Sequence, residues 1–287
     1  MGDWKPDGKK QKPCARTWWY ILVTLFTGML IISMAGFGWT LWRAKNENDD
    51  FAKLAQIAEA ESGDSDAVLR QDNSGTAQEP NTEAAAGKNY QALYNMNPDF
   101  IGWLKIDGTK VDYPVMYTPD DPQYYIYRDF QGRKTSSGTP FMDGNATLDS
   151  DSIILYGHNM KNDTMFGTLD RYQKKEYWEA HPVITFDTLE ENREYEIFAV
   201  FTTRLFRQEE DGFRYYGYVG DLTEAQFNEF VSQSCMASHY DTGIIPEYGD
   251  QILMLSTCSY HTENGRLVVA ARRRREDGNV IEKYTDR

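Results

Sequence analysis

One uncharged stretch near the start of the chain constrains its architecture more than any other feature. Residues 18–42 contain no Asp, Glu, Lys or Arg, and Trp and Tyr residues lie at both ends. At ~1.5 Å per residue this stretch would span about 37 Å as an α-helix, which exceeds the ~30 Å hydrocarbon core of a bilayer. Aromatic residues at both ends are typical of the two membrane interfaces. The stretch therefore predicts a single transmembrane signal anchor.

The charges that flank this stretch predict its orientation. Residues 1–17 form a basic tail with five Lys or Arg and two Asp residues, whereas residues 43–88 carry five basic and ten acidic residues. The positive-inside bias places the tail in the cytoplasm and the rest of the chain outside the cell. A cleaved signal peptide ending near residue 35 is the alternative, but its apolar core is usually only about 7–15 residues long. We expect a single-pass protein of the cell membrane.

Composition divides the remainder into a linker and one folded domain. Residues 43–88 are rich in Ala, Glu, Asp, Asn, Ser and Gln and predict an acidic flexible linker. Within it, apolar residues from Phe51 to Ala58 have helical spacing and predict a short helix. We expect residues 89–287 to form one extracellular domain. The net charge of −14 excludes a general nucleic-acid binder, which needs a surplus of Lys and Arg.

Short apolar runs separated by Gly, Pro and Asp predict a mostly β domain. Two helical patterns interrupt the runs at residues 166–178 and 223–236, and a short helix opens the domain before Asn97-Pro98. Eight short strands with few peripheral helices favour a closed β-barrel or sandwich over alternating βαβ units. The eight runs cover residues 101–106, 111–116, 139–142, 152–156, 183–186, 195–201, 251–256 and 266–271.

Two of the three cysteines lie in the predicted extracellular domain. Cys258 ends an apolar strand and is followed by polar loop residues, which is where a rigid scaffold displays a reactive side chain. Cys235 lies among Phe227, Phe230 and Val231 at helical spacing, which predicts a buried, inert thiol. A disulfide between the two cysteines is the alternative on the oxidising side of the membrane.

A cysteine nucleophile needs a partner that favours its thiolate, because the free thiol has a pKa of about 8.5. His158 ends the buried run 153–157 and is the leading candidate, and His261 is the runner-up. His181 and His239 lie at helix ends, where a surface position explains them. Arg266 opens the strand after Cys258, so a hairpin would bring its guanidinium near the sulfur, where it stabilises a thiolate or an oxyanion.

These residues together resemble the sortase family. Leu-Ser-Thr-Cys at 255–258 looks like the end of the signature Thr-Leu-x-Thr-Cys, with Met254 in place of the first Thr. Tyr-Gly-His at 156–158 resembles the histidine strand of the family, and Arg-Leu-Val-Val at 266–269 resembles its arginine strand. The resemblance covers about residues 90–275. Residues 100–115 and the helical insertion before the cysteine strand are most similar to class B sortases.

The resemblance implies a sortase-type closed β-barrel and a membrane-bound cysteine transpeptidase. Such an enzyme cleaves a C-terminal sorting motif of a secreted protein, holds the product as a thioester and transfers it to an amine of a peptidoglycan precursor or a pilin. Mapped onto this chain, Cys258 is the nucleophile, His158 the general acid/base and Arg266 the group that stabilises the oxyanion or positions the substrate. Ser256 is a candidate substrate contact. No metal or organic cofactor is implied.

Two other functions fit the residues alone. One is a membrane-tethered cysteine peptidase that transfers its substrate to water, and the other is a catalytically silent binding module in which Cys258 is a core thiol.

Ser259 stands where some class B sortases carry an acidic residue. The sequence therefore does not identify the group that orients His158, and it does not choose the sorting motif or the acceptor amine.

Overall fold

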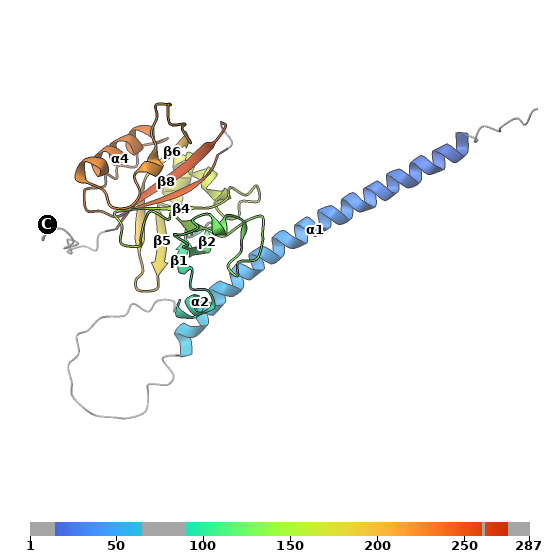
Figure 1. The fold of residues 1–287 in the computed structure, drawn as a ribbon, viewed down its shortest axis with the longest axis horizontal. Coiled ribbons are helices and arrows are strands. Elements are labelled where there is room, and N and C mark those ends of the chain that lie inside the picture. Colours follow the sequence, from blue (N-terminus) through green and yellow to red (C-terminus); the bar gives the residue numbers. More distant parts are fainter. Residues whose placement is uncertain (1–14, 65–89, 260–261, 275–287) are drawn as a thin grey trace, which may run out of the picture. The chain divides into compact units, whose positions relative to one another are not determined.

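The structure of the chain is a computed structural model that describes residues 15–64, 90–259 and 262–274 (Figure 1). The chain divides into two compact units, Met1–Asp50 and Phe51–Arg287. Most of the predicted cytoplasmic tail and residues 65–88 of the predicted linker lie outside the described residues. The domain boundaries drawn from the sequence therefore stay predictions.

Helix α1 (Ala15–Asp64) forms the described part of the first unit, and its residues after Asp50 belong to the second. Its segment Trp18–Gly38 has a mean hydropathy of 2.0 and is, among the described residues, the one helical stretch long and apolar enough to cross a membrane. Among the described residues none of this window is buried, and side chains such as Ile32 and Met29 are more than two-thirds exposed. By length and composition it matches the predicted anchor.

The second unit is a closed eight-stranded β-barrel, which confirms the predicted fold class (Figure 1). Around the barrel the strands follow the order β1-β2-β3-β4-β7-β8-β6-β5. Each strand overlaps one of the eight runs predicted from the sequence. The strands are β1 (Phe100–Lys105), β2 (Asp112–Met116), β3 (Phe141–Met142), β4 (Ser152–Tyr156), β5 (Val183–Thr188), β6 (Glu194–Arg204), β7 (Ile252–Cys258) and β8 (Gly265–Arg273).

The parallel pair β4 and β7 carries apolar side chains on both faces of the sheet. Ile153, Leu155, Leu253 and Leu255 pack inside the barrel, whereas the alternate residues of the same strands pack into a second core under helix α4 (Glu224–Ala237). Both faces are buried, so these strands read as continuous apolar runs without alternation. This double burial holds the ends of β4 and β7 rigidly side by side.

Helix α4 begins where the sequence predicts, at a capping box. The Thr223 hydroxyl accepts a hydrogen bond from the Gln226 backbone N–H, and the Gln226 side chain accepts one from the Thr223 backbone N–H. Phe227 and Phe230 then anchor the helix in the second core. A capping side chain of this kind stabilises its helix by ~1 kcal/mol.

We therefore expect Thr223→Ala to lower the stability of the barrel unit by ~1 kcal/mol. Thr223→Ser keeps the hydroxyl acceptor and should stay close to the wild type. Thermal unfolding of the detergent-solubilised chain measures both variants. Equal midpoints for the Ala and Ser variants would show that the cap contributes nothing.

The structure divides one predicted helical segment in two and contradicts the predicted burial of Cys235. Residues 166–178 form a 3-10 helix, η2 (Gly167–Gln173), and a separate α3 (Lys175–Ala180), divided at Lys174 by extended backbone. Leu169 and Tyr172, three residues apart, are both fully buried, which suits the three-residue period of a 3-10 helix. Cys235 is exposed, not buried, because Ser234 takes the buried position in the last turn of α4.

Shorter elements complete the second unit. The predicted opening helix is α2 (Gln91–Met96), and two short 3-10 helices, η1 (Tyr124–Tyr127) and η3 (Tyr215–Gly217), border the barrel. The apolar residues predicted as a short helix after residue 50 lie in the last part of α1, where Phe51 packs edge-on against Tyr113 at 5.3 Å between ring centroids.

Candidate active site

The register between β4 and β7 brings His158 and Cys258 to the same edge of the barrel. The two strands run parallel with Tyr156 paired to Ser256, so His158 and Cys258 each follow two residues later. Hydrogen bonds continue beyond the paired residues, because Thr257 Oγ1 donates to the Gly157 carbonyl at 2.7 Å. His158 and Cys258 lie a hundred positions apart in the chain, and the paired strands therefore hold them at fixed positions relative to each other.

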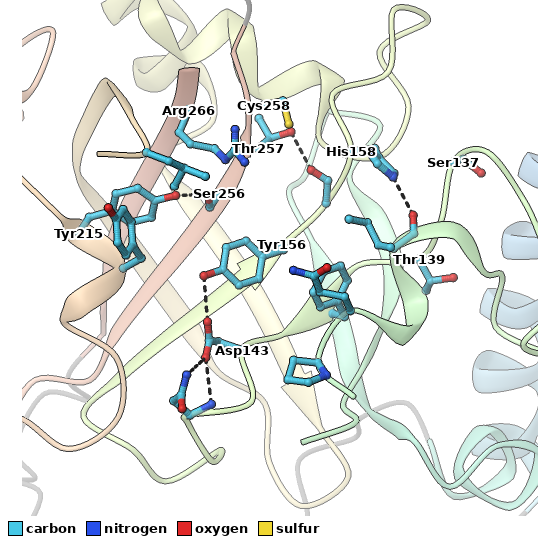
Figure 2. Close-up of a pocket in the computed structure, with 18 of the residues that line it drawn as sticks. Ser137, Thr139, Asp143, Tyr156, His158, Tyr215, Ser256, Thr257, Cys258 and Arg266 are labelled. Atoms are coloured by element: carbon cyan, nitrogen blue, oxygen red, sulfur yellow. Dashed lines mark hydrogen bonds between the residues drawn. The ribbon is translucent and has the colours of Figure 1, made fainter. Parts of the chain in front are cut away.

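Arg266 reaches the same place from the other side. Strand β8 runs antiparallel to β7, and Arg266 is the register partner of Cys258, as the predicted hairpin requires. Directly opposed residues in such a pair have Cα atoms about 5 Å apart. Figure 2 shows Arg266 and His158 on opposite sides of Cys258. The Arg266 side chain also donates to the Gly265 carbonyl at 2.9 Å, which restricts its position.

All four residues singled out from the sequence line one cavity of about 610 Å³, namely His158, Ser256, Cys258 and Arg266. Cys258 and His158 are both partly exposed, so a ligand in the cavity can reach them. Of the other histidines, His181 and His239 do not line the cavity, and His261 lies outside the described residues.

A backbone carbonyl orients the His158 ring. Nε2 of His158 lies 2.7 Å from the carbonyl oxygen of Ile126 in η1, and the ring packs against Tyr127 at 5.1 Å between centroids. A carbonyl oxygen only accepts, so Nε2 is the donor in this hydrogen bond. Within the described part of the chain, no carboxylate forms a hydrogen bond with this ring. Among the same described residues, the ring also forms no hydrogen bond with the Cys258 thiol.

Ser256 belongs to the cavity wall and is almost completely buried there. Its side chain is 2% exposed, and its hydroxyl lies 2.7 Å from the Tyr215 hydroxyl of η3. Burial raises the pKa of Tyr215 above its usual value, although the hydrogen bond from Ser256 and the nearby Arg266 oppose the rise. The phenol therefore stays protonated at neutral pH and remains available as a hydrogen-bond donor beside Cys258.

The opposite end of the cavity carries a polar cluster that the sequence analysis missed. Tyr156 donates to one oxygen of Asp143 at 2.9 Å, and the Asn145 backbone and side-chain amides both donate to the other oxygen at 2.9 Å (Figure 2). Burial, together with the Asp143 charge, raises the pKa of Tyr156 well above its usual value. The sequence shows Asp143-Gly144 only as a turn, so its place in the cavity depends on the tertiary structure.

The arrangement suits covalent acyl transfer. A thiol at a strand end can attack a carbonyl carbon, an imidazole beside it can carry a proton, and a permanently charged guanidinium opposite it can stabilise an oxyanion. Among the described residues, no group of three or more His, Cys, Asp or Glu side chains is placed to hold a metal ion.

Comparison with known proteins points the same way. A family model described as a sortase domain matches residues 104–274. The chain is 34% identical over 183 residues to Sortase B of Listeria monocytogenes, which covers 62% of this chain and 70% of that protein. It is 28% identical over 187 residues to Sortase B of Staphylococcus aureus, which covers 64% of this chain and 73% of that protein.

Solved structures share the barrel. The crystal structure of sortase B from B. anthracis in complex with AAEK1 matches with a TM-score of 0.63 at 28% identity, covering 82% of this chain and 100% of that chain. The Staphylococcus aureus sortase B–substrate complex matches with a TM-score of 0.66 at 24% identity, covering 82% and 99%, which shows a common fold.

Proposed function

Since the chain belongs to the sortase family of cysteine transpeptidases, we propose that it is a membrane-anchored class B enzyme that acts on C-terminal sorting motifs of secreted proteins. The observation that carries the proposal is the cavity in which Cys258, His158 and Arg266 meet. The apolar segment Trp18–Gly38 would anchor the enzyme, with residues 1–17 in the cytoplasm, residues 43–88 as a spacer and residues 89–287 outside.

The reaction proceeds in two acyl transfers. In the first, the Cys258 thiolate attacks the carbonyl carbon of the scissile peptide bond, and Arg266 stabilises the negative charge that develops on the carbonyl oxygen. His158 donates a proton to the leaving amine as the carbon–nitrogen bond breaks, which leaves a thioester on Cys258.

In the second transfer, the amine of a peptidoglycan precursor or pilin attacks the thioester. The nitrogen–carbon bond forms, the carbon–sulfur bond breaks, His158 accepts the amine proton and Cys258 leaves as the thiolate. Ser256 contributes to substrate binding together with its partner Tyr215, which faces the cavity next to Cys258.

The test uses the full-length chain in detergent micelles with peptides that contain Leu-Pro-x-Thr-Gly-like or Asn-Pro-x-Thr-x-like motifs. Each peptide is incubated with and without an oligoglycine or diamino-acid acceptor, and mass spectrometry identifies adducts and products. We expect an acyl adduct on Cys258 and a ligated product that requires the amine. Hydrolysis at the same rate with every amine would support the peptidase instead. No adduct on Cys258 with any peptide would contradict the proposal.

Arg266→Ala is expected to lower kcat/KM by about 10²–10³-fold, the effect of removing one group that stabilises an oxyanion. Arg266→Lys keeps the charge but loses the planar fork, so its activity should fall between the wild type and the Ala variant. Peptide cleavage kinetics measure the series. Arg133→Ala is the matched control, because Arg133 is exposed and pairs with Asp129 away from the cavity.

If Arg266→Ala retained the activity of the Arg133→Ala control, the guanidinium would have no part in the reaction. The register pairing of Arg266 with Cys258 would then serve only the hairpin.

A further inference from the structure

Asn159, the residue after His158, connects the end of the cysteine strand to a neighbouring helix. Its Nδ2 donates to the main-chain carbonyl of Cys258 at 2.8 Å and to Oδ2 of Asp170 at 2.9 Å. The residue is only 9% exposed. A primary amide nitrogen has two N–H groups, so each of them has one acceptor.

The bond to Cys258 extends the contact between β4 and β7 past the end of their ladder. Register pairs between the two strands stop at Tyr156 and Ser256. Beyond them, the Thr257 hydroxyl bonds to Gly157, and the Asn159 amide then bonds to the Cys258 carbonyl. The last tie between the two strands is therefore made at the main chain of the nucleophile itself.

Asn159 is itself held from two sides. Its backbone forms a bridge with Met165, and the next residue, Phe166, donates its N–H to the His158 carbonyl at 2.9 Å. On the other side, Asp170 lies in η2, which is anchored by the fully buried Leu169. An amide held by a carboxylate is well oriented, because a hydrogen bond to an ionised acceptor is stronger than a neutral one.

We propose that Asn159 and Asp170 are positioning residues that hold the main chain of Cys258, and with it the thiol, at a fixed place relative to His158. The inference rests on the proposed function and adds two residues to it. The position requires a group that donates twice, which Asn does and Asp does not, because a carboxylate would set an acceptor against the Cys258 carbonyl and against Asp170. Misplacement of a reacting group by about 1 Å can cost about 100-fold in rate.

The main test compares Asn159→Asp with Asn162→Asp in the full-length chain in detergent micelles. Both substitutions add one negative charge to the same loop, but the Asn162 side chain only accepts hydrogen bonds, from Thr164, and Asp can do the same. The substrate is a sorting-motif peptide that the wild-type enzyme cleaves. Relative to the wild type, Asn159→Asp should lower kcat by about ten-fold or more and leave KM within about two-fold. Asn162→Asp should match the wild type. Equal kcat values for the two folded variants would overturn the inference.

A second pair of variants applies if Asn159→Asp fails to fold. Asp170→Asn keeps an oxygen that accepts from Asn159, whereas Asp170→Ala leaves that N–H without a partner. We expect Asp170→Asn to keep kcat within about two-fold of the wild type and Asp170→Ala to lower it several-fold at unchanged KM. A loss of stability alone would lower the amount of active enzyme. It would not explain why the Asn side chain at position 170 selectively restores kcat. Equal kcat values for both Asp170 variants would overturn the inference.

A measurement without substrate separates this inference from the proposed function. Iodoacetamide is added to the Asn159→Asp and Asn162→Asp variants, and mass spectrometry follows alkylation of Cys258. A carboxylate against the Cys258 main chain disfavours the thiolate, so the Asn159→Asp variant should react several-fold more slowly at neutral pH. Equal alkylation rates would contradict the contact. If the wild type forms no acyl adduct but the alkylation rates differ, the proposed transpeptidation fails while the contact stands.

Discussion

Replacing Cys258 with Ala is expected to abolish formation of the acyl adduct and to lower turnover by at least about 10⁴-fold, because the reaction then has no nucleophile. Mass spectrometry of the peptide incubations measures both effects. The fold should survive, since Cys258 is a partly exposed residue at the end of β7 and the substitution removes a single sulfur atom. We expect the free energy of unfolding to change by no more than ~1 kcal/mol.

Cys235→Ala is the matched control for this prediction. Cys235 is the other free thiol in the described residues of the barrel unit, and it is exposed on the last turn of α4, away from the cavity. The control should keep the wild-type rate and the adduct. If the Cys258→Ala variant kept most of the activity, or the Cys235→Ala variant lost it, the nucleophile would be wrongly assigned.

Replacing His158 with Ala should be nearly as damaging, with a loss of about 10²–10⁴-fold in kcat/KM. In the proposed reaction His158 supplies the proton that the leaving amine needs. An ester analogue of the peptide has an alkoxide leaving group that needs this proton much less. The ratio of ester to amide cleavage should therefore rise in the His158→Ala variant, and parallel assays of the two substrates measure it.

His239→Asn serves as the control, because the His239 side chain is exposed after α4 and does not line the cavity. It should leave both rates unchanged. An equal loss on ester and amide in the His158→Ala variant would show that His158 supports thiolate formation or local structure instead of protonating the leaving group.

The strands of this protein could be predicted from the sequence because their patterns are local. The runs that became β4 and β7 are continuous in apolar residues, and both strands end in polar loops, so Cys258 and His158 could be recognised as displayed residues. The resemblance to the sortase signature, whose elements occur in the same chain order, then implied their roles. Arg266 followed from the hairpin alone, since β8 begins close to the end of β7.

The rest of the site depends on contacts between distant segments. The Ile126 carbonyl that orients His158 carries no side-chain signal, because any residue supplies a backbone carbonyl. Asp143 was visible only as a turn residue, and Tyr215 lies in the short 3-10 helix η3, whose sequence has no periodic pattern. The division of residues 166–178 into two helices has a similar origin, because apolar spacing does not distinguish a 3-10 helix from an α-helix.

The parallel register of β4 and β7 also has a consequence for how the enzyme matures. The paired strands that place His158 near Cys258 join segments a hundred residues apart, and Arg266 is added by β8, the last strand among the described residues. Such long-range pairing forms late in folding, after the entropy of closing a long loop has been overcome. A chain that is still folding holds His158 and Cys258 apart, so the thiol gains its partners only once the barrel closes. An incompletely folded molecule therefore lacks the assembled arrangement of His158, Cys258 and Arg266.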